Sequence, residues 1–279
     1  MTTDADAGKV PSFLYGTAWK EEETSRLTRM ALDAGFRAID TANQRRHYFE
    51  AGVGEAISRA FEEGLVRRDD LFLQTKFTYA AGQDHRLPYD LGAPVARQVE
   101  QSFASSLEHL GVESLDSFVL HGPSMRQGLT DTDWGAWGAM EALQRAGKTR
   151  WLGISNVALD QLEELHEGAA VKPTFVQNRC FASMGWDLEV RRFCREHGVR
   201  YQGFSLLTAN PEVFRHPRLT EIARRLGAHP AQVVFAFARQ VGMIPLIGTT
   251  SAEHMTMDLE ARNVELEAGE IAAIERLIA

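Results

Sequence analysis

Residues 13–19 read FLYGTAW, and this stretch has the composition of a buried β-strand. Such a strand opens both common folds in which strands and helices alternate, the open doubly wound sheet and the closed barrel. In the doubly wound sheet the first strand runs into a glycine-rich turn of the form G-x-G-x-x-G. Gly16 is the only glycine of FLYGTAW and no such turn follows it, so the stretch favours the barrel.

Outward from this stretch, β-rich runs alternate with amphipathic runs along the whole chain, and no low-complexity linker divides it. The predicted strands span residues 12–19, 36–42, 71–77, 115–121, 149–156, 174–180, 199–207 and 243–248. Eight alternating units predict an α/β fold with a single domain, a (β/α)8 TIM barrel over residues 12–279. We expect residues 1–11 to form a flexible N-terminus, because they are largely polar and acidic.

The runs between the strands have helical spacing. Apolar residues recur every three or four positions in residues 96–111, and Gly111 is expected to end that helix. Two helical runs lie between the seventh and eighth strands, so we expect one helix more than the minimal repeat contains. Together with the last two predicted helices, these runs span residues 218–226, 231–241, 251–260 and 269–278.

The composition excludes several classes of protein. With 30 basic and 38 acidic residues the net charge is −8, which disfavours general binding to nucleic acid or to an anionic membrane. Only Cys180 and Cys194 are present, without a C-x-x-C pair, so neither a disulfide framework nor a metal site is predicted. The first residues do not show the basic-then-apolar pattern of a secretory leader, so none is expected, and no apolar run reaches roughly 18 residues. We expect a soluble cytoplasmic protein, either a monomer or a weak homo-oligomer.

Three predicted strands end with ionisable side chains, namely Asp40, Lys76 and His121. The carboxyl ends of barrel strands meet at one rim, where active sites of this fold lie. Each residue taken alone also suits a structural ion pair or a polar cap. With a nearby tyrosine the set gains a chemical role. A lysine ammonium at about 4 Å, with an effective dielectric near 20, favours the phenolate by roughly 4 kcal/mol before desolvation opposes it.

These side chains predict carbonyl chemistry. Asp40 would hold Lys76 protonated, Lys76 would tune the phenol, and His121 would donate a hydrogen bond to a carbonyl oxygen.

The same residues lie in motifs that resemble the aldo-keto reductase superfamily, NAD(P)H-dependent (β/α)8 barrels with an Asp, Tyr, Lys, His tetrad. The resemblance runs from about residue 13 to the end of the chain. It rests on GTAW at 16–19, AGFRAIDTA at 34–42, TK at 75–76, LDSFVLH at 115–121, GISN at 153–156 and Gln177. It implies reversible hydride transfer between a nicotinamide cofactor and an aldehyde or ketone.

The sequence departs from the family pattern D-T-A-x-x-Y-x-N-E at the tyrosine. Arg45 occupies the tyrosine position, and Tyr48 lies eight residues after Asp40. The following Val-Gly pair at residues 53–54 comes two positions later than in the family, which indicates an insertion. We predict Tyr48 as the general acid, with Arg45 and His47 as alternatives and a surface tyrosine as the structural alternative.

The resemblance also implies cofactor contacts. Ser155, Asn156 and Gln177 match residues that bind the nicotinamide carboxamide, and Phe204 matches a tyrosine that stacks on the ring. The further predicted contacts are Thr17, Asp40, Ser205, Leu206, Leu207, Gly248, Thr249, Thr250, His254 and Asp258. Family members often have Arg where His254 stands and Asn where Asp258 stands, so a 2′-phosphate meets less positive charge here. NADPH is preferred over NADH as the predicted cofactor.

Aromatic residues are the candidates for a substrate pocket. Trp19, Tyr48, Phe77, Tyr79 and Trp134 could line the mouth, and barrel packing is their alternative role, favoured for Phe77. The short segment after the last predicted helix suggests an open site for small carbonyl compounds.

Two other functions stay open from the sequence. One is a nucleotide-binding regulatory subunit with little turnover, to which the shifted tyrosine lends weight. The other is a lyase or isomerase with Lys76 as a Schiff-base nucleophile, which Ser155, Asn156 and the loop at Gly248 disfavour.

Overall fold

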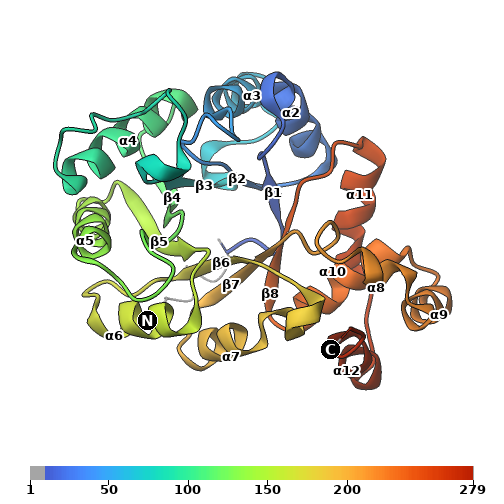
Figure 1. Cartoon of the computed structure of the whole chain (residues 1–279). Helices are drawn as coiled ribbons and strands as arrows, with labels where there is room; N and C mark the ends of the chain where they lie inside the picture. Colours follow the sequence, from blue (N-terminus) through green and yellow to red (C-terminus); the bar gives the residue numbers. More distant parts are fainter. Residues whose placement is uncertain (1–9, 279) are drawn as a thin grey trace.

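The predicted strands are all present and close into a parallel barrel in chain order, β1 to β8, with helices around it (Figure 1). The computed structural model describes residues 10–278. Tyr15 of β1 lies opposite Ile39 of β2 on one side and Ile247 of β8 on the other, which closes the barrel. The strands are β1 (Leu14–Gly16), β2 (Ala38–Asp40), β3 (Phe72–Phe77), β4 (Leu115–Leu120), β5 (Thr149–Ser155), β6 (Phe175–Arg179), β7 (Arg200–Phe204) and β8 (Met243–Ile247).

The (β/α)8 fold is therefore confirmed, while the predicted strands at residues 12–19, 36–42 and 199–207 are too long. Several residues just past these strands are still buried. Leu206, for example, is 1% exposed although β7 ends at Phe204. Burial on both sides of a strand end removes the change in polarity that would mark the boundary in the sequence.

The helices follow the expected order, and the extra helical segment between β7 and β8 is confirmed. α4 ends at Gly111 with φ of 65°, a conformation that favours glycine. The helices are α2 (Thr24–Ala34), α3 (Glu50–Glu62), α4 (Val95–Leu110), α5 (Asp131–Arg145), α6 (Leu159–Gly168), α7 (Leu188–Glu196), α8 (Pro211–Arg215), α9 (Pro217–Leu226), α10 (Pro230–Gln240), α11 (Ala252–Glu260) and α12 (Ala268–Glu275).

The interior of the barrel has two layers of different polarity. At the amino ends of the strands it is filled by an apolar cluster of Leu14, Ala38, Phe72, Trp151, Phe175 and Ile244. Toward the carboxyl ends the interior holds buried polar side chains instead, among them Asp40, Gln74 and Lys76. Buried polar groups require hydrogen-bond partners, so the polar layer is where a specific geometry is expected.

Residues 1–9 and 279 lie outside the described residues, and so does most of the predicted flexible N-terminus. Val10 packs against the apolar cluster. Cys180 and Cys194 are both buried free thiols. Within residues 10–278, every helix is too short or too polar to cross a membrane.

Candidate active site

Asp40 at the end of β2 and Lys76 in β3 form an ion pair inside the polar layer. Lys76 Nζ lies 2.8 and 2.7 Å from the two carboxylate oxygens of Asp40 and 2.8 Å from the Thr41 carbonyl oxygen. Burial would lower the pKa of Lys76, but Asp40 and Tyr48 outweigh it, so the pKa lies above its ordinary value. Lys76 therefore stays charged. The predicted cofactor residue Thr17 is fully buried, and its hydroxyl donates to the Asp40 carbonyl oxygen at 3.0 Å.

The loop at residues 43–48 brings Tyr48 back toward this pair. Its turn is closed by the Tyr48 N–H, which donates to the Gln44 carbonyl oxygen at 3.0 Å. A second hydrogen bond anchors the loop to the segment that follows β1, because the Trp19 N–H donates to the His47 carbonyl oxygen at 2.7 Å. The rings of Trp19 and His47 also stack, with centroids 3.9 Å apart. The inserted residues are thus taken up in a folded turn.

Tyr48 lies between Lys76 and His121. Lys76 Nζ is 5.0 Å from the centroid of the Tyr48 ring, and the Tyr48 and His121 ring centroids are 5.9 Å apart. Burial raises the pKa of Tyr48, and the Asp40 charge adds to the rise, while Lys76 opposes both. The net pKa is above the ordinary tyrosine value, so desolvation outweighs the lysine effect that the sequence suggested. The phenol therefore stays protonated at neutral pH.

His121 directly follows β4 and is held in the neutral state. Its Nδ1 lies 2.6 Å from Thr78 Oγ1, and Asn156 Nδ2 donates to its carbonyl oxygen at 2.8 Å. Burial lowers the pKa of His121 well below the ordinary value, and the charges of Lys76 and His47 lower it further. When the Thr78 hydroxyl donates to Nδ1, Nε2 carries the proton and can donate to an oxygen.

The three residues expected to bind a carboxamide meet after β5 and in β6. Ser155 Oγ donates to the Gln177 carbonyl oxygen at 2.6 Å and lies 3.1 Å from Asn156 Nδ2. Asn156 has φ of 51°, a left-handed conformation that costs energy for a residue other than glycine. Gln177 Nε2 donates to Asp40 Oδ1 at 3.0 Å, which links this group to the ion pair.

Phe204, the predicted stacking residue, is half-buried at the end of β7. The guanidinium of Arg179 lies over its ring, 5.6 Å from the centroid, and the sequence reasoning missed this residue. Ser205 follows with φ of 57°, Leu206 is buried, and Leu207 is half-buried. These positions therefore lie at the carboxyl end of the barrel, with strained backbone at Ser205.

A buried lysine that the sequence reasoning also missed lies beside the loop after β8. Lys20 Nζ donates to the Gly248 carbonyl oxygen at 2.8 Å and lies 5.1 Å from the centroid of the Tyr15 ring. Tyr15 in turn donates to the Thr249 carbonyl oxygen at 3.1 Å. Burial lowers the pKa of Lys20 to about 8. Its position directly after the GTAW motif could have marked it as a candidate.

The remaining predicted cofactor residues lie on this loop and on α11. Thr250 and His254 are exposed, and the Ser251 hydroxyl caps the helix by accepting from the His254 N–H at 3.3 Å. Asp258 is buried, and desolvation raises its pKa to about 6. A carboxyl group with this pKa is mostly charged at pH 7, although its environment disfavours the charge.

Two of the predicted pocket aromatics, Phe77 and Tyr79, pack against each other. Phe77 is 0% exposed and packs edge-on against Tyr79, with centroids 5.2 Å apart. The Tyr79 hydroxyl donates to Asp133 Oδ1 at 3.0 Å, at the start of α5. Lys76 points into the barrel, so its neighbour Phe77 points outward because side chains alternate along a strand. Phe77 is therefore not a pocket residue and has the barrel-packing role that the sequence favoured for it, while the pocket role of Tyr79 stays a prediction.

Trp134 of α5 was also predicted to line the pocket, but it packs against α6. A Cβ built on Gly168 would lie 2.6 Å from Trp134 Cη2, so the indole rests directly on that glycine. Trp19 does lie at the mouth, where it is 71% exposed and stacked on His47.

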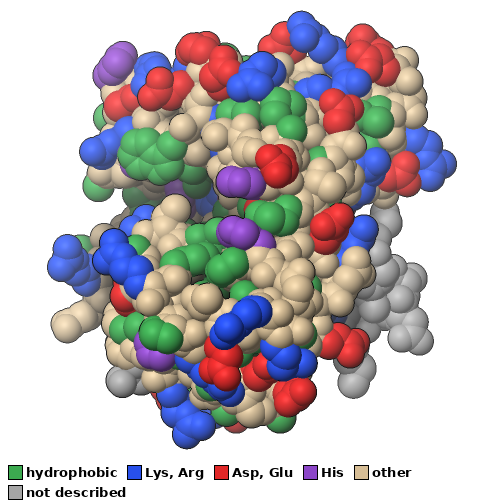
Figure 2. Space-filling model, turned by 90° about the vertical axis from the view of Figure 1, so that its right-hand side faces the viewer, with side chains coloured by type: hydrophobic (Ala, Val, Ile, Leu, Met, Phe, Trp, Pro, Cys, Tyr) green, Lys and Arg blue, Asp and Glu red, His purple; other side chains and the backbone are tan. Residues whose placement is uncertain are grey.

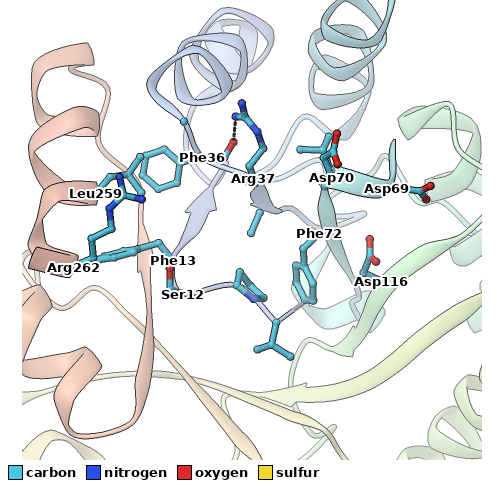
Figure 3. A pocket seen from close by; sticks show the side chains of 15 residues that line it. Ser12, Phe13, Phe36, Arg37, Asp69, Asp70, Phe72, Asp116, Leu259 and Arg262 are labelled. Carbon is cyan, nitrogen blue, oxygen red and sulfur yellow. Dashed lines mark hydrogen bonds between the residues drawn. The ribbon is translucent and has the colours of Figure 1, made fainter. Parts of the chain in front are cut away.

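A separate cavity lies at the amino ends of the strands (Figure 3). It has a volume of about 610 Å³, with Asp69 and Asp116 on one side and Arg262 on the other. Asp116 pairs with Arg68 at 2.9 Å, and Arg37 donates to main-chain carbonyls. The surface is also hollowed between the upper and lower halves of the molecule, at the left edge of Figure 2.

A sequence profile of the Aldo/keto reductase family matches residues 12–210 and 213–279. The chain belongs to this family. The aldo-keto reductase assignment agrees with the barrel and with the cluster of Asp40, Tyr48, Lys76 and His121 at its carboxyl end. A related protein of Bacillus subtilis (strain 168), called uncharacterized oxidoreductase YtbE, is 29% identical over 271 residues, covering 96% of this chain and 89% of that protein.

Solved structures show the same fold. An aldo/keto reductase from Brucella melitensis has a TM-score of 0.82 at 24% identity and covers 99% of this chain and 98% of its own. The silkworm reductase AKR2E5, solved in complex with NADPH, has a TM-score of 0.82 at 22% identity and covers 96% of this chain and 84% of its own. This aldo-keto reductase is an NAD(P)H-dependent oxidoreductase.

Proposed function

We propose that this aldo-keto reductase uses NADPH to reduce small aldehydes or ketones to alcohols, reversibly, with Tyr48 as the general acid. The observation that carries the proposal is the position of Tyr48 between Lys76 and His121. Lys76 Nζ is 5.0 Å from the centroid of the Tyr48 ring, and the centroids of the Tyr48 and His121 rings are 5.9 Å apart. A neutral acid, a fixed cation and a neutral hydrogen-bond donor converge where a carbonyl oxygen would become negative.

The nicotinamide cofactor fits the polar atoms at the carboxyl end of the barrel. Among the described residues, Gln177 Oε1 has no hydrogen-bond partner, and Asn156 is held in a strained conformation beside it. The aromatic face of Phe204 lies next along the barrel rim and suits a planar ring. When bound, the reduced nicotinamide supplies the hydride that the chain itself cannot provide.

The protein residues manage charge and protons at the substrate oxygen. Neutral His121 can donate from Nε2, because its lowered pKa keeps it uncharged at neutral pH. Tyr48 can then donate its hydroxyl proton to the oxygen as negative charge develops. The Lys76 ammonium stabilises the phenolate that remains, and Asp40 keeps Lys76 in place. The reverse oxidation would use the phenolate of Tyr48 as the base.

Lys76 is poorly suited to the alternative Schiff-base chemistry. A nucleophilic amine needs a free electron pair, but Lys76 is a buried ammonium with three oxygen acceptors around Nζ. A regulatory subunit would have no need of such a cluster. The complete set of acid, cation and donor therefore favours turnover.

NADPH is the proposed cofactor, with NADH as a weaker alternative. Lys20 supplies a buried cation beside Gly248, and the hydroxyls of Thr249, Thr250 and Ser251 precede α11, where a phosphate could be bound. Asp258 opposes this preference, because its carboxyl group is largely charged at pH 7.

The experiment follows NADPH oxidation with 4-nitrobenzaldehyde in wild type and Tyr48→Phe. We expect the variant to lose roughly 10²- to 10⁴-fold in kcat, while its NADPH affinity and melting temperature stay near wild type. Arg45→Ala and His47→Ala are the matched controls from the same loop. Full activity of Tyr48→Phe, together with inactivity of either control, would show that another residue is the acid.

A further inference from the structure

Three glutamines meet inside the barrel, in the polar layer beneath the candidate active site. Gln74 comes from β3, Gln177 from β6 and Gln202 from β7. Their side chains are buried, with 0%, 3% and 0% exposure. β3 and β7 are not neighbours in the barrel, so Gln74 and Gln202 meet across its interior. Buried amides are costly unless their hydrogen bonds are made, so each of these three amides requires partners inside the barrel.

The hydrogen bonds form one closed network that ends on Asp40. Gln74 Nε2 donates to Asp40 Oδ1 at 2.7 Å and to Gln202 Oε1 at 2.8 Å, and Gln202 Nε2 donates back to Gln74 Oε1 at 3.0 Å. Gln177 Nε2 donates to Asp40 Oδ1 at 3.0 Å and to Gln202 Oε1 at 2.9 Å. The Asp40 carboxylate can only accept, so it fixes the Gln74 amide with Nε2 toward Asp40, and the reciprocal bonds then fix which end of the Gln202 amide is the donor.

This network determines the orientation of the Gln177 amide. Its Nε2 faces two acceptors, Asp40 Oδ1 and Gln202 Oε1, so a flipped amide would bring oxygen against oxygen. Gln177 Oε1 is therefore the end that is left without a partner among the described residues. An oxygen can only accept a hydrogen bond, and a carboxamide NH2 is a suitable donor.

The network also bears on the ion pair. Asp40 Oδ1 accepts from Lys76, Gln74 and Gln177. Three donors hold the carboxylate oxygen in one position, and Lys76 is held with it. The Gln177 amide, which would meet the cofactor, is thus joined to the Asp40–Lys76 ion pair beside the phenol in one hydrogen-bonded unit.

We propose that Gln74 and Gln202 are positioning residues that hold the Gln177 amide with its oxygen toward the nicotinamide carboxamide and keep Asp40 aligned with Lys76. Neither residue touches the cofactor in this scheme. The inference rests on the proposed function, because it requires the nicotinamide to lie at Gln177.

The test compares NADP⁺ with its 3-acetylpyridine analogue, in which a methyl group replaces the amide NH2. Binding constants are measured by quenching of tryptophan fluorescence in wild type, Gln202→Met and Gln74→Met/Gln202→Met. Methionine matches the length of glutamine without its amide, and the double variant leaves no unpaired partner in that pair. We expect wild type to prefer NADP⁺ by about tenfold. The preference should fall about fivefold in the double variant and by less in Gln202→Met.

Gln161→Met is the matched control, since Gln161 is also buried and donates two hydrogen bonds, to the Met125 and Gly128 carbonyl oxygens in another part of the fold. It should lower the melting temperature without changing the preference for NADP⁺. If the double variant does not fold, Gln202→Met alone decides. The inference is overturned if wild type shows no preference, or if the variants keep the wild-type preference. Failure of wild type to bind NADP(H) would instead refute the proposed function.

Discussion

The two ends of the proposed cofactor and substrate site are built differently. Around β2, β3 and β4 the charges are buried and paired, as in the Asp40–Lys76 ion pair with its 2.7 Å contact. Around the loop after β8, Lys20 donates to a main-chain carbonyl, and Asp258 is a buried carboxyl group with a pKa of about 6. The first region is fixed for proton transfer before any ligand arrives. The second holds a cation and a carboxyl group whose charges burial disfavours.

The largest expected effect comes from breaking the Asp40–Lys76 ion pair. Lys76→Met leaves the Asp40 carboxylate buried without its cation, which should cost about 3–5 kcal/mol of unfolding free energy. Carbonyl reduction should fall by at least about 10³-fold, because the phenolate loses its stabilising charge. Urea unfolding and steady-state kinetics measure the two effects. The Asp40→Asn/Lys76→Met double variant should recover much of the stability and none of the activity.

A change of pH tests the same region without mutation. The pKa of Tyr48 lies above its ordinary value and that of His121 well below, so the acid stays protonated and the histidine neutral between them. The kcat/KM for the aldehyde, measured at saturating NADPH, should therefore be flat from about pH 7 to 9 and decline only at higher pH. A tenfold fall per unit of pH between 7 and 9 would contradict this assignment of the acid.

In the region around the loop after β8, the first test is at Lys20. Removal of this charge in Lys20→Met should weaken NADPH binding by about 10- to 100-fold, the range for a charge-assisted hydrogen bond. Because burial lowers the pKa of Lys20 to about 8, wild-type affinity should also weaken as the pH rises above 8. Fluorescence titration measures both effects. Lys172→Met is the control, since Lys172 also donates to main-chain carbonyls but lies at the end of α6.

Asp258→Asn should act in the opposite direction and more weakly. The folded pKa of about 6 exceeds the unfolded value near 3.9, so the buried charge destabilises the fold above pH 6 and not below pH 4. At pH 8 the variant should gain on the order of 2 kcal/mol in unfolding free energy and bind NADPH a few-fold more tightly. Denaturant unfolding at pH 8 and at pH 4 separates the two conditions, and an equal gain at both would contradict the assignment.

The smallest effect is expected at the exposed rim. Trp19→Ala removes a ring that is 71% exposed, so stability should change by no more than about 0.5 kcal/mol. The KM for aromatic aldehydes should rise a few-fold with little change in kcat. Trp134→Phe serves as a control, since this ring packs on Gly168 away from the mouth and should leave KM unchanged.

The sequence located the charged residues at strand ends more reliably than it located the aromatic residues. Asp40, Lys76 and His121 could be identified because strand ends of a barrel converge by topology alone. Trp134 was misplaced because an aromatic side chain suits a core as well as a pocket. Only the direction in which each side chain points separates these two roles.

The alternation of strands and helices, together with the motifs at the strand ends, determined the barrel and the family from the sequence alone. Those features are local, because hydrophobic periodicity and strand-end chemistry can be read within a few residues. The position of Tyr48 after an insertion and the joining of Gln74 to Gln202 were decided only by the tertiary structure. Gln74 and Gln202 are separated by 128 positions in the chain, and closure of the barrel alone brings their amides within hydrogen-bonding distance.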